Sequence, residues 1–202
     1  MSSFSSQIKE LASSMFMQMG IKQVSMDDLS AKLKISKKTL YNNFKDKGTL
    51  VDSAVFHHFN EIENKLSEIN RSSDNPINKM LNGARLAVEQ LAKVNPKMIV
   101  DLEKYHPETH AKLEEYRIDS INKHITDNIE EGRELGIYRS DFDSGVITPL
   151  FVEMLFHLTH GLAAGKSKYQ PDSIKELVSY HLHGICTKSG LSELEKTLQN
   201  EQ

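Results

Sequence analysis

The 202-residue sequence predicts an all-α protein. Apolar residues recur every three or four positions along almost the whole chain, which is the period of an amphipathic helix. Short segments rich in glycine, proline, serine or asparagine separate these stretches, as they commonly separate helices. No segment of useful length alternates apolar and polar residues as a half-buried strand would, and no internal repeat is found.

The first two helices are predicted from their ends. An amphipathic pattern covers residues 4–19 and stops at Gly20, a residue type that often follows the last turn of a helix. In the segment VSMDDLSAKL, Ser25 is followed three residues later by Asp28, which resembles a capping box. A short helix over residues 26–33 is therefore expected.

The remaining helices follow in order along the chain. Ser36 is a candidate N-cap for the next helix, and the polar segment NRSSDNP at residues 70–76 divides two longer ones. The predicted helices after residue 35 cover residues 37–44, 46–69, 77–91, 96–106, 108–132, 147–162 and 174–185. A mildly amphipathic tail begins at Gly190.

Composition limits the class of protein. The single cysteine, Cys186, excludes a disulfide within the chain and is typical of a reducing compartment. The N-terminal residues contain no apolar signal core, and no uninterrupted apolar run reaches membrane-spanning length. A cytoplasmic protein is expected.

Charge is distributed unevenly. Residues 1–50 contain eight lysines and four acidic residues, a net charge of +4, whereas the other 152 residues carry −7. A basic head on an acidic body is typical of a polyanion-binding module joined to a part that does not bind polyanions. A lysine-rich solvated surface is the alternative for the charge alone.

Residues 25–50 predict a helix-turn-helix, in which the second helix enters the DNA major groove by its first residues. The two helices are joined at Lys34 and Ile35, and Leu40 and Phe44 are assigned to a small core. Lysine, threonine, tyrosine and asparagine side chains can reach base edges or phosphates, and helix starts suit phosphates. The predicted DNA-binding residues are Ser25, Ser36, Lys37, Lys38, Thr39, Tyr41, Asn42, Lys45 and Lys47.

The segment VSMDDLSAKLKISKKTLYNNFKDKGTLV resembles the N-terminal domain of TetR-family transcriptional regulators. The family pattern, a serine-capped helix reading roughly Leu-Tyr-x-x-Phe-x-x-Lys, is matched by Leu40, Tyr41, Phe44 and Lys47. The resemblance covers residues 4–55. Two positions depart from the family: Lys34 replaces a usual glycine and Gly48 a usual acidic residue.

The resemblance implies a DNA-binding domain at residues 1–48 and an effector-binding and dimerisation domain at residues 49–202. It also implies a repressor that binds a palindromic operator in double-stranded DNA and is released by a small-molecule effector. A positive φ at Lys34 would cost about 1 kcal/mol. The glycine at residue 48 would weaken the start of the fourth helix.

Two wide apolar stripes, residues 147–162 and 174–185, indicate a homodimer interface built as a four-helix bundle. The alternative is that both stripes fill the core of their own chain. The predicted interface residues are Leu150, Leu158, Leu162, Leu177 and Leu182.

Methionine and aromatic residues in the second half of the chain predict a pocket for an apolar or aromatic effector. Any one of these residues can equally be a core residue. The candidates are Met98, Tyr105, His106, Tyr116, Phe151 and Met154.

No metal site, cofactor or enzymatic activity is expected. His106 and His110, or Glu153 with His157 and His160, share spacings of three or four, but no HExxH motif occurs. The sequence also contains no glycine-rich phosphate loop and no nucleophile elbow. Two other functions stay open: a helical adaptor for an acidic protein partner, and a ligand carrier or bundle enzyme using the histidine-bearing helices.

Overall fold

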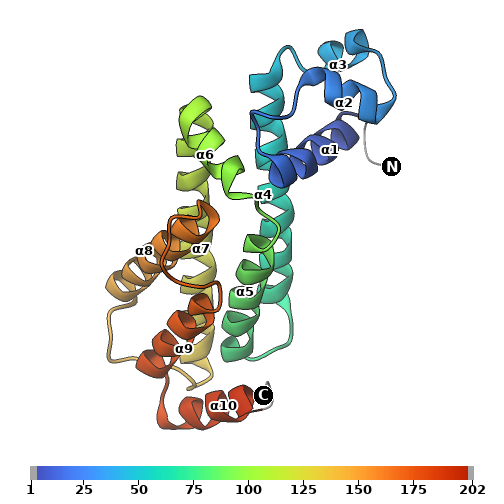
Figure 1. The fold of residues 1–202 in the computed structure, drawn as a ribbon. Coiled ribbons are helices and arrows are strands. Elements are labelled where there is room, and N and C mark those ends of the chain that lie inside the picture. Colours follow the sequence, from blue (N-terminus) through green and yellow to red (C-terminus); the bar gives the residue numbers. More distant parts are fainter. Residues whose placement is uncertain (1–3, 200–202) are drawn as a thin grey trace. The chain divides into compact units, whose positions relative to one another are not determined.

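The computed structural model describes residues 4–199. In these residues ten α-helices account for all regular structure apart from an isolated antiparallel bridge between Tyr138 and Cys186 (Figure 1). The all-α prediction is therefore confirmed. The helices are α1 (Phe4–Met19), α2 (Met26–Leu33), α3 (Lys37–Asn43), α4 (Lys47–Arg71), α5 (Pro76–Leu91), α6 (Pro96–Tyr105), α7 (Pro107–Glu134), α8 (Ser144–Ala163), α9 (Ser173–Ile185) and α10 (Lys188–Gln199).

The chain divides into two compact units, and the long helices α4 and α7 contribute to both. The first unit comprises Met1–Asn64, Lys93–Glu115 and Ala163–Gly165, and the second comprises Lys65–Ala92, Tyr116–Leu162 and Lys166–Gln202. The first unit extends beyond residue 48, because part of α4, α6 and the start of α7 join the N-terminal helices. The functional boundary at residue 48 stays a prediction.

The first unit has its own apolar core. Ile8, Phe16 and Leu29 from α1 and α2 are completely buried, and Leu102 from α6 joins the same cluster. At the end of α1, the side chain and backbone N–H of Asn95 donate to the carbonyl oxygens of Gln18 and Met17, at 2.9 and 2.8 Å. These contacts hold the start of α6 on the end of α1.

Proline and asparagine explain where three helices begin. Asn75 and Asn95 accept a hydrogen bond from the first turn of α5 and α6, and a proline follows each of them at the first helical position. Pro107 opens α7 in the same position. Proline suits this place because its missing N–H would have had no partner inside the helix.

The second unit contains a separate core, in which α5 packs along α9. Near the end of α7, Tyr138 packs against Gly132, where an added Cβ would lie 2.0 Å from the tyrosine ring. The Tyr138 hydroxyl donates to Asn128, and the Asn128 amide donates to the carbonyl of Pro76. Ile129 is completely buried beside them. This network ties the loop after α7 to the start of α5.

Helix α8 has the most apolar composition of the described helices. It is long and apolar enough to cross a membrane, but one helix of this kind is weak evidence for a membrane span. Its buried face includes Phe151 and Val152, whereas Val146, Leu150 and Met154, spaced four residues apart, are about half exposed. Four residues are about one helical turn, so these three side chains form one apolar stripe on the outside of the unit.

The predicted interface residues divide between surface and core. Leu150 is exposed, and Leu158, Leu162 and Leu177 are partly buried. Leu182 is completely buried against its own chain, so it is a core residue and cannot contact a partner. Its assignment to the interface is corrected accordingly, because the inner face of α9 packs on α5.

Candidate nucleic-acid interface

The turn between α2 and α3 is formed by a left-handed residue. Lys34 has φ 56° and ψ 42°, and it is the one non-glycine residue with positive φ in the described part of the chain. The backbone N–H of Ile35 donates to the carbonyl of Ser30 at 3.0 Å, the long-range bond of a Schellman motif. The expected strain at this position is therefore present, and the turn fixes the angle between the two helices.

One face of helix α3 packs against the core of the first unit, and the opposite face is exposed to solvent. Leu40 is completely buried and Phe44 is almost so, which confirms their assignment to the small core. Lys38, Tyr41 and Asn42 are all exposed on the remaining surface. A short helix that buries two apolar anchors and exposes polar side chains fits a groove-reading role.

Two of the predicted contact residues cap their helices. Ser25 accepts a hydrogen bond from the Asp28 N–H, and the Asp28 carboxylate accepts from the backbone N–H of Ser25, which is the predicted capping box. These bonds from Ser25 lower the pKa of the Asp28 carboxyl. Ser36 accepts from the N–H of Thr39 at 3.0 Å, and the two hydroxyls are 2.8 Å apart. Ser25, Ser36 and Thr39 thus already have partners within the protein.

Two lysines are also engaged inside the unit. The ammonium of Lys37 lies 2.7 Å from the Asp27 carboxylate, whose hydrogen bond raises the pKa of Lys37. Both groups are exposed, so solvent and salt weaken this pair. Lys47 donates to the carbonyl of Ile21 at 2.6 Å, and burial lowers its pKa. A phosphate contact by Lys47 requires its ammonium to leave that carbonyl, and the contact stays a prediction.

Four of the predicted DNA-binding residues are exposed and make no side-chain hydrogen bonds within the described part of the protein. They are Lys38, Tyr41, Asn42 and Lys45. Asp46 beside them caps α4, because its carboxylate accepts from the N–H and hydroxyl of Thr49 at 2.8 and 2.9 Å. The exposed set therefore comes from α3 and the tight connection that follows it.

The predicted effector residues have different environments. Met98 lies in the core of the first unit. Tyr105, in the same unit, is exposed, and His106 is the C-cap residue of α6. In the second unit Phe151 is buried and stacked on His181, with ring centroids 3.7 Å apart. Tyr116 and Met154, also assigned to this pocket, are exposed. The pocket stays a prediction for all six residues.

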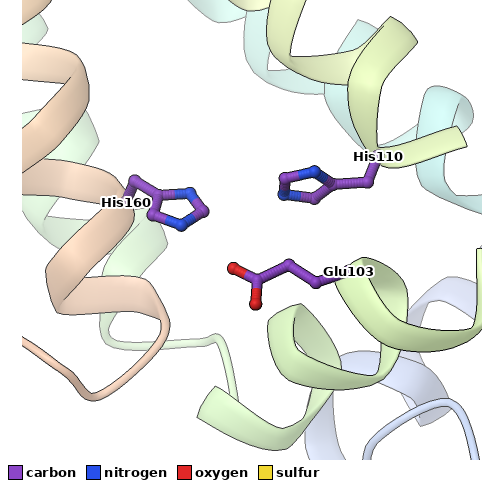
Figure 2. A group of neighbouring side chains, drawn as sticks. All are labelled: Glu103, His110 and His160. Carbon is purple, nitrogen blue, oxygen red and sulfur yellow. The ribbon is translucent and has the colours of Figure 1, made fainter. Parts of the chain in front are cut away.

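The helix ends show which of the closely spaced histidines lie on the same helix. His106 follows α6 and has φ −137°, so it does not share a helical face with His110 on α7. The carboxylate of Glu103 on α6 and the imidazole of His110 lie close together, with their ligand atoms within 4.8 Å of each other (Figure 2). His160, also labelled there, belongs to the second unit.

One group beside this interface was not predicted from the sequence. Lys22, in the loop between α1 and α2, lies 3.5 Å from the hydroxyl of Tyr105, although 83 positions separate the two residues. No local pattern connects such distant positions. In the sequence, Lys22 counted only as one of the eight lysines in the first fifty residues.

Comparison with known proteins supports the same interpretation. Residues 8–54 match the family model described as bacterial regulatory proteins, tetR family. No curated protein shows a significant sequence match.

Solved structures share the fold over nearly the whole chain. The ketosteroid transcriptional regulator KstR2 of Mycobacterium tuberculosis is 18% identical, with 93% of this chain and 97% of that chain covered and a TM-score of 0.60. The reduced form of NemR from E. coli is 13% identical, with coverage of 91% and 97% and a TM-score of 0.70. The fatty acid degradation regulator FadR from Bacillus halodurans is 14% identical, with coverage of 91% and 97% and a TM-score of 0.63.

The matched segment contains the capped α2, the Lys34 turn and the exposed face of α3, and the solved regulators share the helical fold beyond it. The family consists of transcription factors rather than enzymes. Residues 8–54 therefore match the DNA-binding domain of the tetR family, and this match supports a DNA-binding transcriptional regulator.

Proposed function

We propose that the protein is a homodimeric repressor that binds a palindromic operator and releases it when a small-molecule effector binds. The observation that carries the proposal is the two-sided character of α3. Its apolar side is anchored by Leu40 and Phe44, while Lys38, Tyr41 and Asn42 are exposed. The protein would act in the cytoplasm, where the operator is accessible.

Base readout is assigned to two exposed residues of α3, Lys38 in its first turn and Asn42 in its last. Lys38 can donate to guanine O6 and N7, and Asn42 can pair with adenine N6 and N7 in the major groove. Tyr41 and Lys45 are suited to phosphates, which position the helix without reading sequence. Thr39 would offer its methyl group to a base, because its hydroxyl is engaged with Ser36.

Dimerisation is supported by the exposed stripe of α8. Val146, Leu150 and Met154 would be covered by the same stripe of a second chain, which is the self-complementary contact of a two-fold dimer. Tyr180 on α9 is 78% exposed and would contribute to the rim. Two identical α3 helices related by a two-fold axis would then read a palindrome.

Effector binding is assigned to the second unit, with an apolar or aromatic ligand near Phe151. Two buried polar atoms there lack a hydrogen-bond partner: Oγ1 of Thr148, one turn before Phe151, and Nε2 of His181, whose ring stacks on it. Buried polar groups normally have partners, so a ligand with one hydroxyl or carbonyl group would complete these bonds. Release follows when this ligand binds the DNA-free conformation more tightly.

Selection of bound fragments from random duplex DNA tests the proposal. The full-length protein should enrich a palindrome, and its affinity should fall steeply with salt as counterions are released. Lys38→Ala should relax the base preference at one position of each half-site. Lys112→Ala, which removes an exposed lysine from α7, is the charge-matched control and should keep the preference. A flat salt dependence without any enriched sequence would refute the proposal.

Effectors are then sought with the selected operator. Candidate apolar and aromatic metabolites are added to the protein–DNA complex, and release is followed by fluorescence anisotropy. Leu150→Asp, which places a charge in the α8 stripe, should yield monomers in sedimentation and weaken operator binding. A dimer of unchanged stability in this variant would rule out the assigned interface.

A further inference from the structure

Tyr105 lies between two lysine ammonium groups on the surface of the first unit. Tyr105 is 46% exposed, and the ammonium groups of Lys22 and Lys104 lie 5.5 and 5.3 Å from the centroid of its ring. Lys22 also donates to the phenol oxygen at 3.5 Å. The two lysines together lower the pKa of Tyr105, since both favour negative charge at its oxygen.

Neither ammonium group of this cluster is paired with a carboxylate in residues 4–199. Asp101 is close, but its carboxylate accepts from the backbone N–H of Lys22 at 2.7 Å and not from the ammonium. Two ammonium groups that converge on one phenol repel each other, so an anion bound between them would stabilise the arrangement.

The cluster is connected to the predicted DNA-binding residues through the loop between α1 and α2. Lys22 belongs to the loop that ends at Ser25, the N-cap of α2, and the preceding residue Ile21 accepts the hydrogen bond from Lys47 at the start of α4. The bond from Lys22 to Asp101 fixes the same loop to α6. All of these residues belong to the first unit, so the cluster and α3 are parts of one compact body.

We infer that Lys22, Lys104 and Tyr105 bind a backbone phosphate of the operator that α3 does not contact. The inference rests on the proposed function and adds a second element, α6, to the DNA-contacting surface. Lysine and tyrosine side chains are common phosphate ligands in protein–DNA complexes. Because Lys22 donates to the phenol oxygen, the phenol O–H proton is left to donate to a non-bridging phosphate oxygen.

The exposure of the cluster favours a polymer phosphate over a small phosphorylated metabolite. Small ligands lose about 70–90% of their surface in a concave site. Tyr105 is instead nearly half exposed, and both lysines approach it from the surface. A duplex presents its phosphates to such open basic clusters without entering a cavity.

Neutral phosphate substitution tests the inference. Each phosphate of the selected operator is replaced in turn by an uncharged methylphosphonate, and affinity is measured for the wild type and for the double variant Lys22→Ala/Lys104→Ala. One substitution per half-site should weaken the wild type several-fold and leave the double variant unchanged. The slope of log K against log salt should also be shallower in the double variant, by about 0.9 for each phosphate that the protein no longer neutralises.

Two further variants separate the roles. Tyr105→Phe keeps the ring and removes the O–H, so it should weaken binding at the same phosphate by a smaller factor. Lys112→Ala should behave as the wild type at every position, and thermal unfolding checks that all variants are folded.

The outcomes distinguish this inference from the proposed function. A wild type that binds no duplex would overturn both. A wild type that binds its operator, with the double variant showing the same methylphosphonate profile and salt slope, overturns the phosphate contact alone. Titration with inorganic phosphate gives the remaining outcome: tight binding that the double variant loses, without any change in DNA affinity, would assign the cluster to a small anion instead.

Discussion

Replacing Lys34 by glycine should stabilise the protein, although it removes a side chain. Lys34 has φ 56° and ψ 42°, a left-handed conformation that costs an L-residue about 1–2 kcal/mol. Glycine removes this cost, but it also gives the unfolded chain more conformational freedom. That freedom lowers the free energy of unfolding by about 0.5–1 kcal/mol. The net gain for Lys34→Gly therefore lies between about 0 and 1.5 kcal/mol, with a central value of about 0.75 kcal/mol, or about 2–3 °C in Tm for a chain of this size.

Two control variants separate backbone strain from the loss of a charge. Lys34→Ala removes the same exposed side chain and keeps the strained φ, so its stability should match the wild type within about 0.5 kcal/mol. Lys32→Gly places glycine at an exposed position inside α2 and should cost about 0.5–1 kcal/mol. Glycine should therefore stabilise the protein at residue 34 and destabilise it at residue 32. Because the two positions are only two residues apart, this difference isolates the effect of φ.

Urea unfolding of the full-length chain measures these differences at one fixed protein concentration, since dimerisation adds to apparent stability. The turn geometry should be unchanged in Lys34→Gly, because the bond from Ile35 to Ser30 uses backbone atoms alone. A Lys34→Gly variant no more stable than Lys34→Ala would show that the left-handed turn carries no strain and would refute the argument.

Three other predictions test the packing and electrostatics of the fold. Gly48→Ala should raise stability by about 0.5 kcal/mol in the same urea assay, because the added Cβ meets only the Asp46 carboxylate, at 3.4 Å, and glycine is a poor helix residue. Glu131→Gln should be more destabilising than Lys79→Met, by about 1–3 kcal/mol in thermal unfolding, since the first change leaves the buried Lys79 ammonium facing a neutral amide instead of the carboxylate 2.7 Å away; equal losses would contradict this. Burial lowers the pKa of His181 to about 4, so the folded state disfavours its protonation. The stability that the neutral His181 contributes should fall by about 2–3 kcal/mol as pH drops from 6.5 to 4 and then level off, and His181→Leu should show a shallower pH dependence.

Local chemistry in the sequence predicted the secondary structure well. The Ser25–Asp28 capping box, Ser36 as an N-cap and Gly20 as a helix stop all occur in the structure, where Gly20 has φ 88°. These signals are reliable because each depends on a few neighbouring residues and on backbone hydrogen bonds that they make locally. The positive φ at Lys34, where the family usually has glycine, belongs to the same class of local signal.

The sequence was less informative about which candidate side chains are available to a ligand. Lys47 and Thr39 have residue types suited to DNA, yet both are engaged within the first unit. Leu182 has the same apolar character as Leu150, but one is buried and the other exposed. Periodicity assigns a residue to a face of its helix and does not say what covers that face.

The sequence by itself therefore determined the helices, their caps and the basic helix-turn-helix, because these depend on residues within one or two turns of each other. Only the tertiary structure decided which polar groups are already paired and which distant residues share a surface. The cluster of Lys22, Lys104 and Tyr105 shows the reason: residues 83 positions apart meet because the loop after α1 is fixed to α6 through Asp101. Such contacts arise from packing between elements, and packing has no signature in a local segment.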